Sequence, residues 1–178
     1  MPKRLKSISR EILHTNPWWT YKYDKYTLPG GGVGEYYYAE TAGFCMIIPV
    51  LPDGRLVLTL QYRYLSDRQG IEFPAGGIGN DKNVLAAAKR ELQEETGCVG
   101  EQWRKVGVFE GSKSMIKNNL AHVFLVQVSS QCAQQLDETE EIDVLYRTPT
   151  EVDAMISDNT IWDGSSIAAW CLARPHVV

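Results

Sequence analysis

Cysteine and histidine are scarce in this 178-residue sequence, and the few that are present are scattered. The four cysteines form no CxxC pair, and the three histidines are isolated. This spacing argues against a zinc site and a thioredoxin-type redox motif, and it predicts buried free thiols. His122 falls in an apolar strand-like segment, where a packed or hydrogen-bonded side chain is expected rather than a metal ligand.

The sequence also lacks a long hydrophobic run, because its longest apolar stretch covers only residues 44–50. A transmembrane helix needs about 20 mostly apolar residues. Residues 1–13 are basic and amphipathic but have no apolar signal-peptide core. We therefore expect a cytoplasmic protein without a membrane partner.

Positive charge is not in excess, since 18 Lys+Arg stand against 22 Asp+Glu, with a net charge of -4 and a pI near 5.4. Nucleic acids and anionic membranes select for basic surfaces, so no nucleic-acid partner is expected. The length suits one compact domain, with or without an appended arm.

Aromatic residues are concentrated in the first forty positions, which hold eight of the eighteen aromatics. Side-chain alternation predicts strands around residues 19–23 and 35–38, joined through the glycine-rich residues 28–34. A strand-like segment follows these glycines, so they indicate a hairpin turn and not a phosphate loop, which would lead into a helix. An arm this small cannot bury its own faces and is expected to pack on the main domain or on a second subunit.

From residue 42 onward the pattern is that of a mixed α/β domain. Strands are predicted at residues 44–50, 56–61, 103–110, 122–128 and 142–146, and helices at residues 83–96, 150–157 and 165–173. The first of these helices has Asn83 as its N-cap and Gly97 where a left-handed C-cap belongs.

Three glutamates near the end of this first helix share one face, because Glu91, Glu94 and Glu95 are spaced i, i+3 and i+4. Each like-charge pair costs roughly 0.2–0.5 kcal/mol, and the helix C-terminus adds a penalty of about 0.3–1 kcal/mol per negative charge. Arg90 relieves part of this repulsion, and a bound Mg²⁺ or Mn²⁺ would relieve the rest. A solvated acidic helix end is the alternative. The glycine-rich segment 72–79 favours the metal, because its backbone can approach the carboxylates and offer a carbonyl oxygen.

A longer pattern surrounds these glutamates. Gly76 is followed after five residues by Lys82, and after seven more by Arg90-Glu-Leu-Gln-Glu-Glu-Thr-Gly-Cys98. In spacing, and almost wholly in identity, this run resembles the Nudix box. Lys82 departs from it, because the family has a glutamate there that mainly supports the box arginine. The resemblance implies that metal binding survives, with Arg90 held differently and helped by Asp81. Reduced activity or a changed metal preference is the alternative.

The resemblance covers most of the chain and points to the branch that hydrolyses ADP-ribose and other nucleoside diphosphate sugars. The features that carry it are the aromatic arm, Gln61-Tyr-Arg63, Glu72-Phe-Pro-Ala-Gly76 and the acidic loop 137–143.

The resemblance also implies roles for individual residues. The metal ligands would be the Ala75 carbonyl and the carboxylates of Glu91, Glu94, Glu95 and Glu140. Glu138 would be the general base, and Glu94 and Arg90 would be the other catalytic residues.

The substrate contacts implied by the resemblance are fewer. Arg63 would contact the diphosphate or orient Glu72. Ser112 either lines the substrate pocket or is a plain surface residue. In the acidic loop, Glu141 allows a different alignment to the family's distal Glu-x-Glu pattern, which competes with the one that uses Glu138 and Glu140. A solvated loop without a functional role is a further alternative.

We therefore expect a Nudix α/β/α sandwich with a mixed sheet over residues 41–178, and an N-terminal β arm over residues 1–40 that mediates a homodimer. The expected activity is Mg²⁺-dependent hydrolysis of ADP-ribose or a related nucleoside diphosphate sugar, with Mn²⁺ as a second metal. The alternatives are a Nudix hydrolase of another nucleoside polyphosphate and a non-catalytic nucleotide-sugar sensor.

The acidic charge is concentrated where metal is expected. Residues 90–95 and 137–143 hold eight acidic residues and one arginine, while the rest of the chain carries 17 Lys+Arg and 14 Asp+Glu. The net negative charge therefore does not exclude a phosphate ligand, since cations bound at these acidic segments would attract it.

Overall fold

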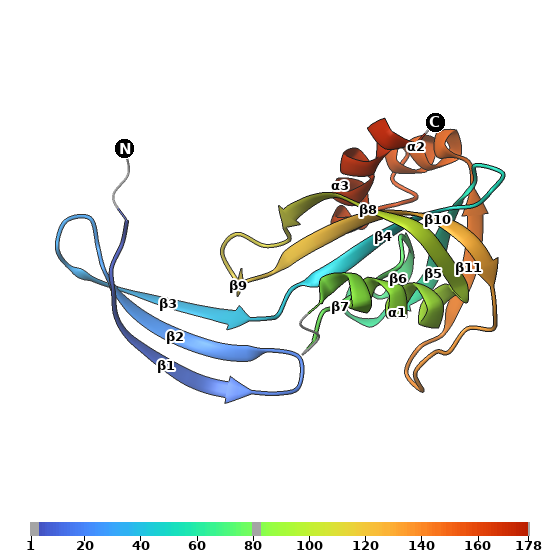
Figure 1. Cartoon of the computed structure of the whole chain (residues 1–178). Coiled ribbons are helices and arrows are strands. Elements are labelled where there is room, and N and C mark those ends of the chain that lie inside the picture. Colours follow the sequence, from blue (N-terminus) through green and yellow to red (C-terminus); the bar gives the residue numbers. More distant parts are fainter. Residues whose placement is uncertain (1–3, 80–82, 178) are drawn as a thin grey trace. The chain divides into compact units, whose positions relative to one another are not determined.

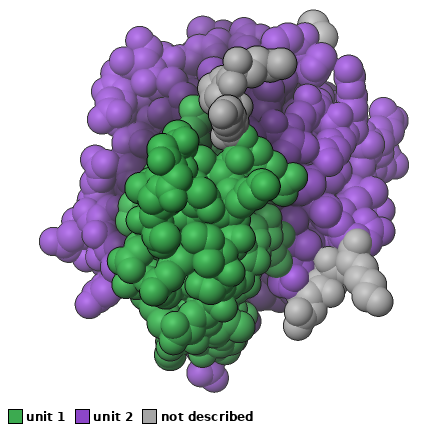
Figure 2. All heavy atoms as spheres, turned by 90° about the vertical axis from the view of Figure 1, so that its left-hand side faces the viewer, with its two compact units in different colours: residues 1–43, 110–120 green, residues 44–109, 121–178 purple. Residues whose placement is uncertain are grey.

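The computed structural model describes residues 4–79 and 83–177 (Figure 1). The chain divides into two compact units, shown in separate colours in Figure 2. Unit 1 spans Met1–Gly43 and Glu110–Leu120, and unit 2 spans Phe44–Phe109 and Ala121–Val178. Unit 1 thus includes residues 110–120, which the sequence analysis assigned to the main domain. Asp81 and Lys82, the box positions of interest, lie outside the described residues.

Unit 1 is built on a four-stranded sheet with the order β1-β2-β3-β9. Its strands are β1 (Ser7–Thr15), β2 (Thr20–Thr27), β3 (Val33–Glu40) and β9 (Ile116–Lys117). The β2–β3 hairpin confirms the prediction for the glycine-rich segment, where Gly31 has a φ of 92° and the amide of Leu28 donates to the carbonyl of Gly32. The sequence analysis missed β1. All nine of its residues are exposed, so it has no alternation between a buried and a solvent face.

Unit 2 is built on a seven-stranded mixed sheet with the central order β11-β5-β4-β10-β8. The strands are β4 (Phe44–Val50), β5 (Leu56–Arg63), β6 (Arg68–Glu72), β7 (Ala75–Gly77), β8 (Cys98–Glu110), β10 (Leu120–Gln131) and β11 (Ile142–Arg147). β4 and β10 run parallel, while β11 and β6 are antiparallel to β5, and β7 is antiparallel to β4.

Helices cover both faces of this sheet (Figure 1). Successive residues of β4 alternate between two cores: Cys45 and Ile47 pack with residues of α1 (Val84–Thr96), and Met46 and Ile48 pack with residues of α2 (Pro149–Ser157) and α3 (Gly164–Ala173). The period-two alternation of a strand produces this division. The predicted α/β/α sandwich with a mixed sheet is confirmed. Two short 3₁₀ turns complete the elements, η1 (Tyr64–Ser66) and η2 (Arg174–His176).

Local capping sets the ends of the helices that matter for the site. The Asn83 side chain accepts a hydrogen bond from the amide of Leu85 at 3.0 Å, and Gly97 ends α1 with a φ of 69°. Asp163 caps α3 by accepting from the amide of Ser166 at 2.7 Å. These are the expected roles of Asn, Asp and Gly at helix ends. Among the described residues, no helix has the length and apolar character needed to cross a membrane.

Candidate active site

The β7–α1 segment brings two of the predicted glutamates against the backbone of the glycine-rich loop. The amide of Ala75 donates to Glu95 Oε2 at 3.1 Å. A Cβ on Gly76 would lie 1.9 Å from the carboxylate carbon of Glu91. A glycine at this position therefore lets the Glu91 carboxylate lie directly against the strand.

Burial and repulsion perturb both carboxylates. Glu95 is only 6% exposed, and its pKa is raised to about 8 by burial and by the charges of Glu91 and Glu140, although the Ala75 amide lowers it. The pKa of Glu91 is also raised, first by burial, while Arg90 acts in the opposite direction. A strongly perturbed pKa in a group of acidic side chains is typical of a functional site.

Arg90 lies between two glutamates of the same helix. Its Nη2 contacts Glu91 Oε1 at 2.7 Å, and its Nη1 contacts Glu94 Oε2 at 2.6 Å. The guanidinium thus holds two of the predicted metal ligands, and the structure supports a positioning role for it.

The acidic loop begins close to the end of α1. Gln134 donates through Nε2 to the carbonyls of Glu95, at 2.6 Å, and Ile142, at 3.1 Å. Within the loop, the carboxylate of Glu140 accepts from the amide of Asp137 at 3.1 Å, while Glu138 is exposed. After burial, the charge of Glu140 also contributes to the raised pKa of Glu91 and of Glu95. The sequence analysis missed Gln134, because a glutamine that binds only backbone carbonyls leaves no motif.

Arg63, at the end of β5, and Glu72, at the end of β6, form a two-point ion pair. Arg63 Nε contacts Glu72 Oε1 at 2.7 Å, and Arg63 Nη2 contacts Glu72 Oε2. Gly70 leaves room for this pair, because a Cβ there would lie 2.5 Å from Glu72 Oε1. The pKa of Arg63 is raised, mainly by Glu72 and further by Glu95 and Asp163. Arg63 therefore stands among carboxylates with 40% of its side chain exposed to a ligand.

A cavity of about 520 Å³ opens beside this ion pair. Arg63, Glu72 and Ala75 line it together with Tyr64 and Trp162, which the sequence analysis did not single out. Such a volume lies within the range of small-molecule sites, roughly 300–1,000 Å³.

The comparison with known families decides the identity. A profile described as the NUDIX domain matches residues 40–170. This chain belongs to the Nudix family and is a Nudix hydrolase.

Relatives of this Nudix hydrolase include two proteins named ADP-ribose pyrophosphatase. It is 24% identical over 166 residues to the one from Bacillus subtilis (strain 168), with 92% of this chain and 89% of the relative covered. It is 33% identical over 101 residues to the one from Mycobacterium tuberculosis (strain ATCC 25618 / H37Rv), with 56% and 48% covered. A crystal structure of an ADP compounds hydrolase has a similar fold, with a TM-score of 0.83 at 18% identity over 97% of this chain and 94% of that chain.

The donor set of the Nudix hydrolase fits a hard divalent cation. Glu91 and Glu95 supply carboxylate oxygens, and Ala75 can supply a carbonyl oxygen, a chemistry that Mg²⁺ and Mn²⁺ prefer. Across residues 4–79 and 83–177, no three Asp, Glu, His or Cys side chains are already gathered as a metal site. Glu91 pairs with Arg90 through Oε1 and Glu94 through Oε2, so each carboxylate has a second oxygen that can bind a cation.

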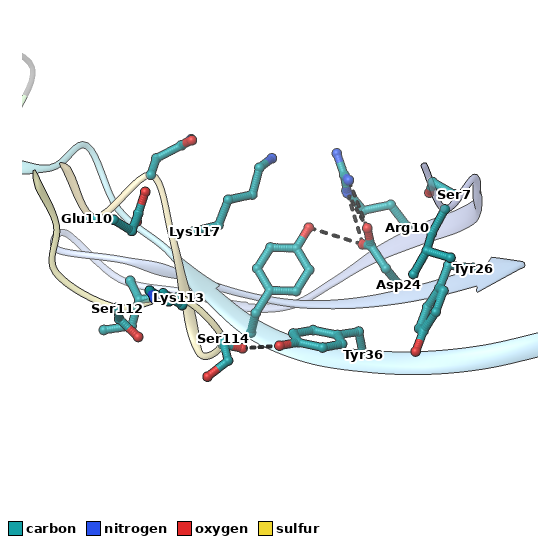
Figure 3. A pocket seen from close by; sticks show the side chains of 14 residues that line it. Ser7, Arg10, Asp24, Tyr26, Tyr36, Glu110, Ser112, Lys113, Ser114 and Lys117 are labelled. Atoms are coloured by element: carbon teal, nitrogen blue, oxygen red, sulfur yellow. Dashed lines mark hydrogen bonds and ion pairs between the residues drawn. The ribbon is translucent and has the colours of Figure 1, made fainter. Parts of the chain in front are cut away.

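Ser112 is grouped with the arm and not with the other predicted substrate contacts. It belongs to unit 1, whereas Arg63 and Glu72 belong to unit 2. Ser112 lines a cavity of about 640 Å³ within unit 1, with Arg10 and Asp24 among the other lining residues (Figure 3). Arg10 there is bound to Asp24 by contacts of 2.8–3.2 Å, so its charge is already neutralised.

Proposed function

We propose that this Nudix hydrolase uses Mg²⁺, or Mn²⁺ in its place, to cleave the diphosphate of ADP-ribose or a related nucleoside diphosphate sugar. The products would be a nucleoside monophosphate and a sugar phosphate. One observation carries the proposal: the buried carboxylates at the Ala75–Gly76 backbone share one unit with a partly exposed arginine and a cavity. The names of the two bacterial relatives support ADP-ribose as the first substrate to test.

The metal would be held by the Ala75 carbonyl, Glu91 and Glu95, with Glu94 and Glu140 as further carboxylates. When bound, it would neutralise diphosphate charge and lower the pKa of a coordinated water. The pKa values of Glu91 and Glu95 are raised mainly by burial and further by neighbouring carboxylates. They support this assignment, because a nearby divalent cation would favour the ionised form of both groups.

The chain's own residues would then act on the diphosphate and on the attacking water. Arg63 would bind the diphosphate, and the two-point contact with Glu72 fixes the direction of its guanidinium. Glu138, exposed on the acidic loop, would take the proton of the attacking water as general base. Arg90 would position Glu91 and Glu94.

A substrate panel tests the proposal. The purified protein is incubated with ADP-ribose, ADP-glucose and ATP in Mg²⁺, Mn²⁺ or EDTA, and release of AMP is measured. AMP should appear with the two sugar nucleotides only when metal is present. Glu95→Gln should abolish it, while Glu101→Gln, at an exposed position of β8, should not. Equal turnover of Glu95→Gln and wild type would refute the metal assignment.

We also propose that the arm forms a homodimer. β1 is an edge strand of the unit 1 sheet, and it exposes large apolar side chains such as Ile8 at 55% and Ile12 at 61%. Unpaired strand edges and exposed apolar groups of this kind are features that a partner covers. Light scattering of wild type and Ile12→Lys would test it, since the variant should shift toward the monomer mass. A cytoplasmic location stays a prediction.

A further inference from the structure

The cavity of about 520 Å³ in unit 2 has a second wall that the proposed function does not use. Trp162, Asp163 and Ser165, at the start of α3, form this wall. Its rim is the η1 turn, where Tyr64 is 83% exposed and therefore accessible to a ligand.

The start of α3 is hydrogen-bonded to β6, the strand that carries Glu72, and to the residue that follows it. The amide of Phe73, next to Glu72, donates to the buried hydroxyl of Ser166 at 3.0 Å. Trp162 Nε1 donates to the carbonyl of Gln69 at 2.9 Å. These contacts place a fixed wall next to the residues expected to bind the diphosphate.

Trp162 is poorly suited to stack on a nucleobase. The guanidinium of Arg68 lies 3.7 Å from the centroid of its indole ring and occupies one face. Its only hydrogen-bond donor is already used by the Gln69 carbonyl. In the described part of the chain, Phe44 and Tyr64 are the other aromatic residues that line the cavity. Phe44 is partly buried and already packs edge-to-face on Phe109, with ring centroids 6.2 Å apart. Tyr64 is therefore the exposed ring, and a single exposed ring cannot enclose a base between two faces.

Asp163 is suited to bind hydroxyl groups. Its Oδ2 caps α3 through the Ser166 amide, while its Oδ1 has no hydrogen-bond partner among the residues that the structure describes. Two hydroxyl-bearing residues, Ser66 and Ser165, also line the cavity. A free carboxylate oxygen with hydroxyls nearby matches a ligand that carries several hydroxyl donors, as a sugar does.

We propose that this cavity is the sugar subsite, and that Asp163 accepts hydrogen bonds from the hydroxyls of the sugar phosphate half of the substrate. The assignment rests on the proposed function, since it places the diphosphate on Arg63 and the sugar beyond it. Asp163 is then the residue that selects a hydroxylated group at this end of the diphosphate.

The substitution Asp163→Asn tests the assignment with little risk to the fold, because asparagine caps helices as well as aspartate does. Asp158→Asn is the matched control: it makes the same change at an exposed turn residue that does not line the cavity. Binding of ribose 5-phosphate and of AMP to each protein in Mg²⁺ is measured by calorimetry. We expect Asp163→Asn to weaken the binding of ribose 5-phosphate by about 10-fold or more, because a hydrogen bond to a charged group is lost. AMP should be unaffected, and Asp158→Asn should bind both as wild type does.

An indirect effect through Arg63 would have the opposite sign. Removing the Asp163 charge near Arg63 would strengthen the binding of any phosphate, so a selective loss for ribose 5-phosphate cannot arise in this way. A selective loss for AMP, equal losses for both ligands, or no loss at all would overturn the assignment. So would wild-type protein that does not bind ribose 5-phosphate.

The binding measurement does not depend on turnover. If wild type binds ribose 5-phosphate through Asp163 but does not hydrolyse ADP-ribose, the proposed function fails while the subsite stands. If it hydrolyses ADP-ribose and Asp163→Asn has an unchanged KM, the subsite fails while the proposed function stands.

Discussion

Replacing Gly76 by alanine would place a methyl group where the Glu91 carboxylate now lies. The new Cβ would be 1.9 Å from the carboxylate carbon and 2.2 and 2.3 Å from its two oxygens. Since ordinary contacts are at about 3.5 Å, the carboxylate would have to retreat by roughly 1.5 Å.

The stability change should be small, because the obstructing group is the end of a flexible side chain. A strained Glu91 rotamer costs about 0.5–1.5 kcal/mol. Alanine also restricts the unfolded chain, which stabilises the folded state by about 0.4–1 kcal/mol. These opposing effects leave the free energy of unfolding within about 1 kcal/mol of wild type.

Metal-dependent activity should respond much more strongly. Metal–ligand distances are held within about 0.2 Å, so a carboxylate displaced by more than 1 Å is lost as a ligand. We expect the Mg²⁺ concentration for half-maximal activity to rise at least about 10-fold. This is the smaller end of the loss in metal affinity that follows when residues orienting the metal ligands are mutated.

Gly77→Ala is the matched control, since the nearest atom to its Cβ would be 4.0 Å away and its φ is not positive. Urea unfolding and Mg²⁺ titrations of ADP-ribose hydrolysis are compared for wild type and both variants. If Gly76→Ala keeps the wild-type Mg²⁺ dependence, Glu91 does not bind metal beside this strand. If Gly77→Ala loses activity to the same extent, the effect belongs to the loop in general and not to the Glu91 contact.

Three further predictions concern the helix end, the buried carboxylate and the ion pair. Gly97→Ala should destabilise the protein by about 2 kcal/mol or more in urea unfolding, because the residue has a φ of 69° and its Cβ would meet a backbone oxygen at 2.1 Å; Gly164→Ala, with nothing within 4 Å, should be nearly neutral. In EDTA, stability should fall as pH rises from about 4.5 to 8, since the raised pKa of Glu95 means that the fold favours its protonated form. The loss is on the order of 4 kcal/mol, and urea unfolding at several pH values should show a flatter profile in Glu95→Gln. Arg63→Lys should lower kcat/KM for ADP-ribose by about 10-fold to 100-fold, because lysine keeps the charge but loses the planar fork; an unchanged kcat/KM would remove Arg63 from the diphosphate site.

Local sequence patterns predicted the elements whose signals are short-range. The caps at Asn83 and Gly97 fixed the limits of α1, and the i, i+3, i+4 spacing placed its glutamates on one face. The strand β4 was predicted with its observed bounds, because a run of buried apolar residues marks it. These features depend on residues that are close together in the chain.

The rest depended on contacts between distant segments or on signals that exposure removes. β1 has no buried face, so its side chains show no alternation of burial. Asp163 carries an ordinary helix-cap signal, but its position near Arg63 depends on how α3 packs on the sheet. That packing includes the hydrogen bond between Phe73 and Ser166, which are 93 residues apart in the sequence. Neither the local sequence around Arg63 nor that around Asp163 indicates that the two residues lie close together, and amino-acid composition carries no such information.

If unit 2 binds metal and diphosphate as proposed, its arrangement of charges predicts that the two bind cooperatively. Arg63 is paired with Glu72 and is influenced by the charges of Glu95 and Asp163, and these carboxylates would compete with a diphosphate for its guanidinium. Without a cation these carboxylates would repel the ligand that Arg63 would bind. The pKa of Glu95 is raised mainly by its burial and further by the charges of Glu91 and Glu140. A bound cation would turn that repulsion into attraction for a phosphate and would so raise substrate affinity. By linkage the substrate must raise metal affinity by the same factor. On the proposed function, the acidic residues would thus be a condition for binding an anionic substrate, since they would repel a diphosphate until the cation is present.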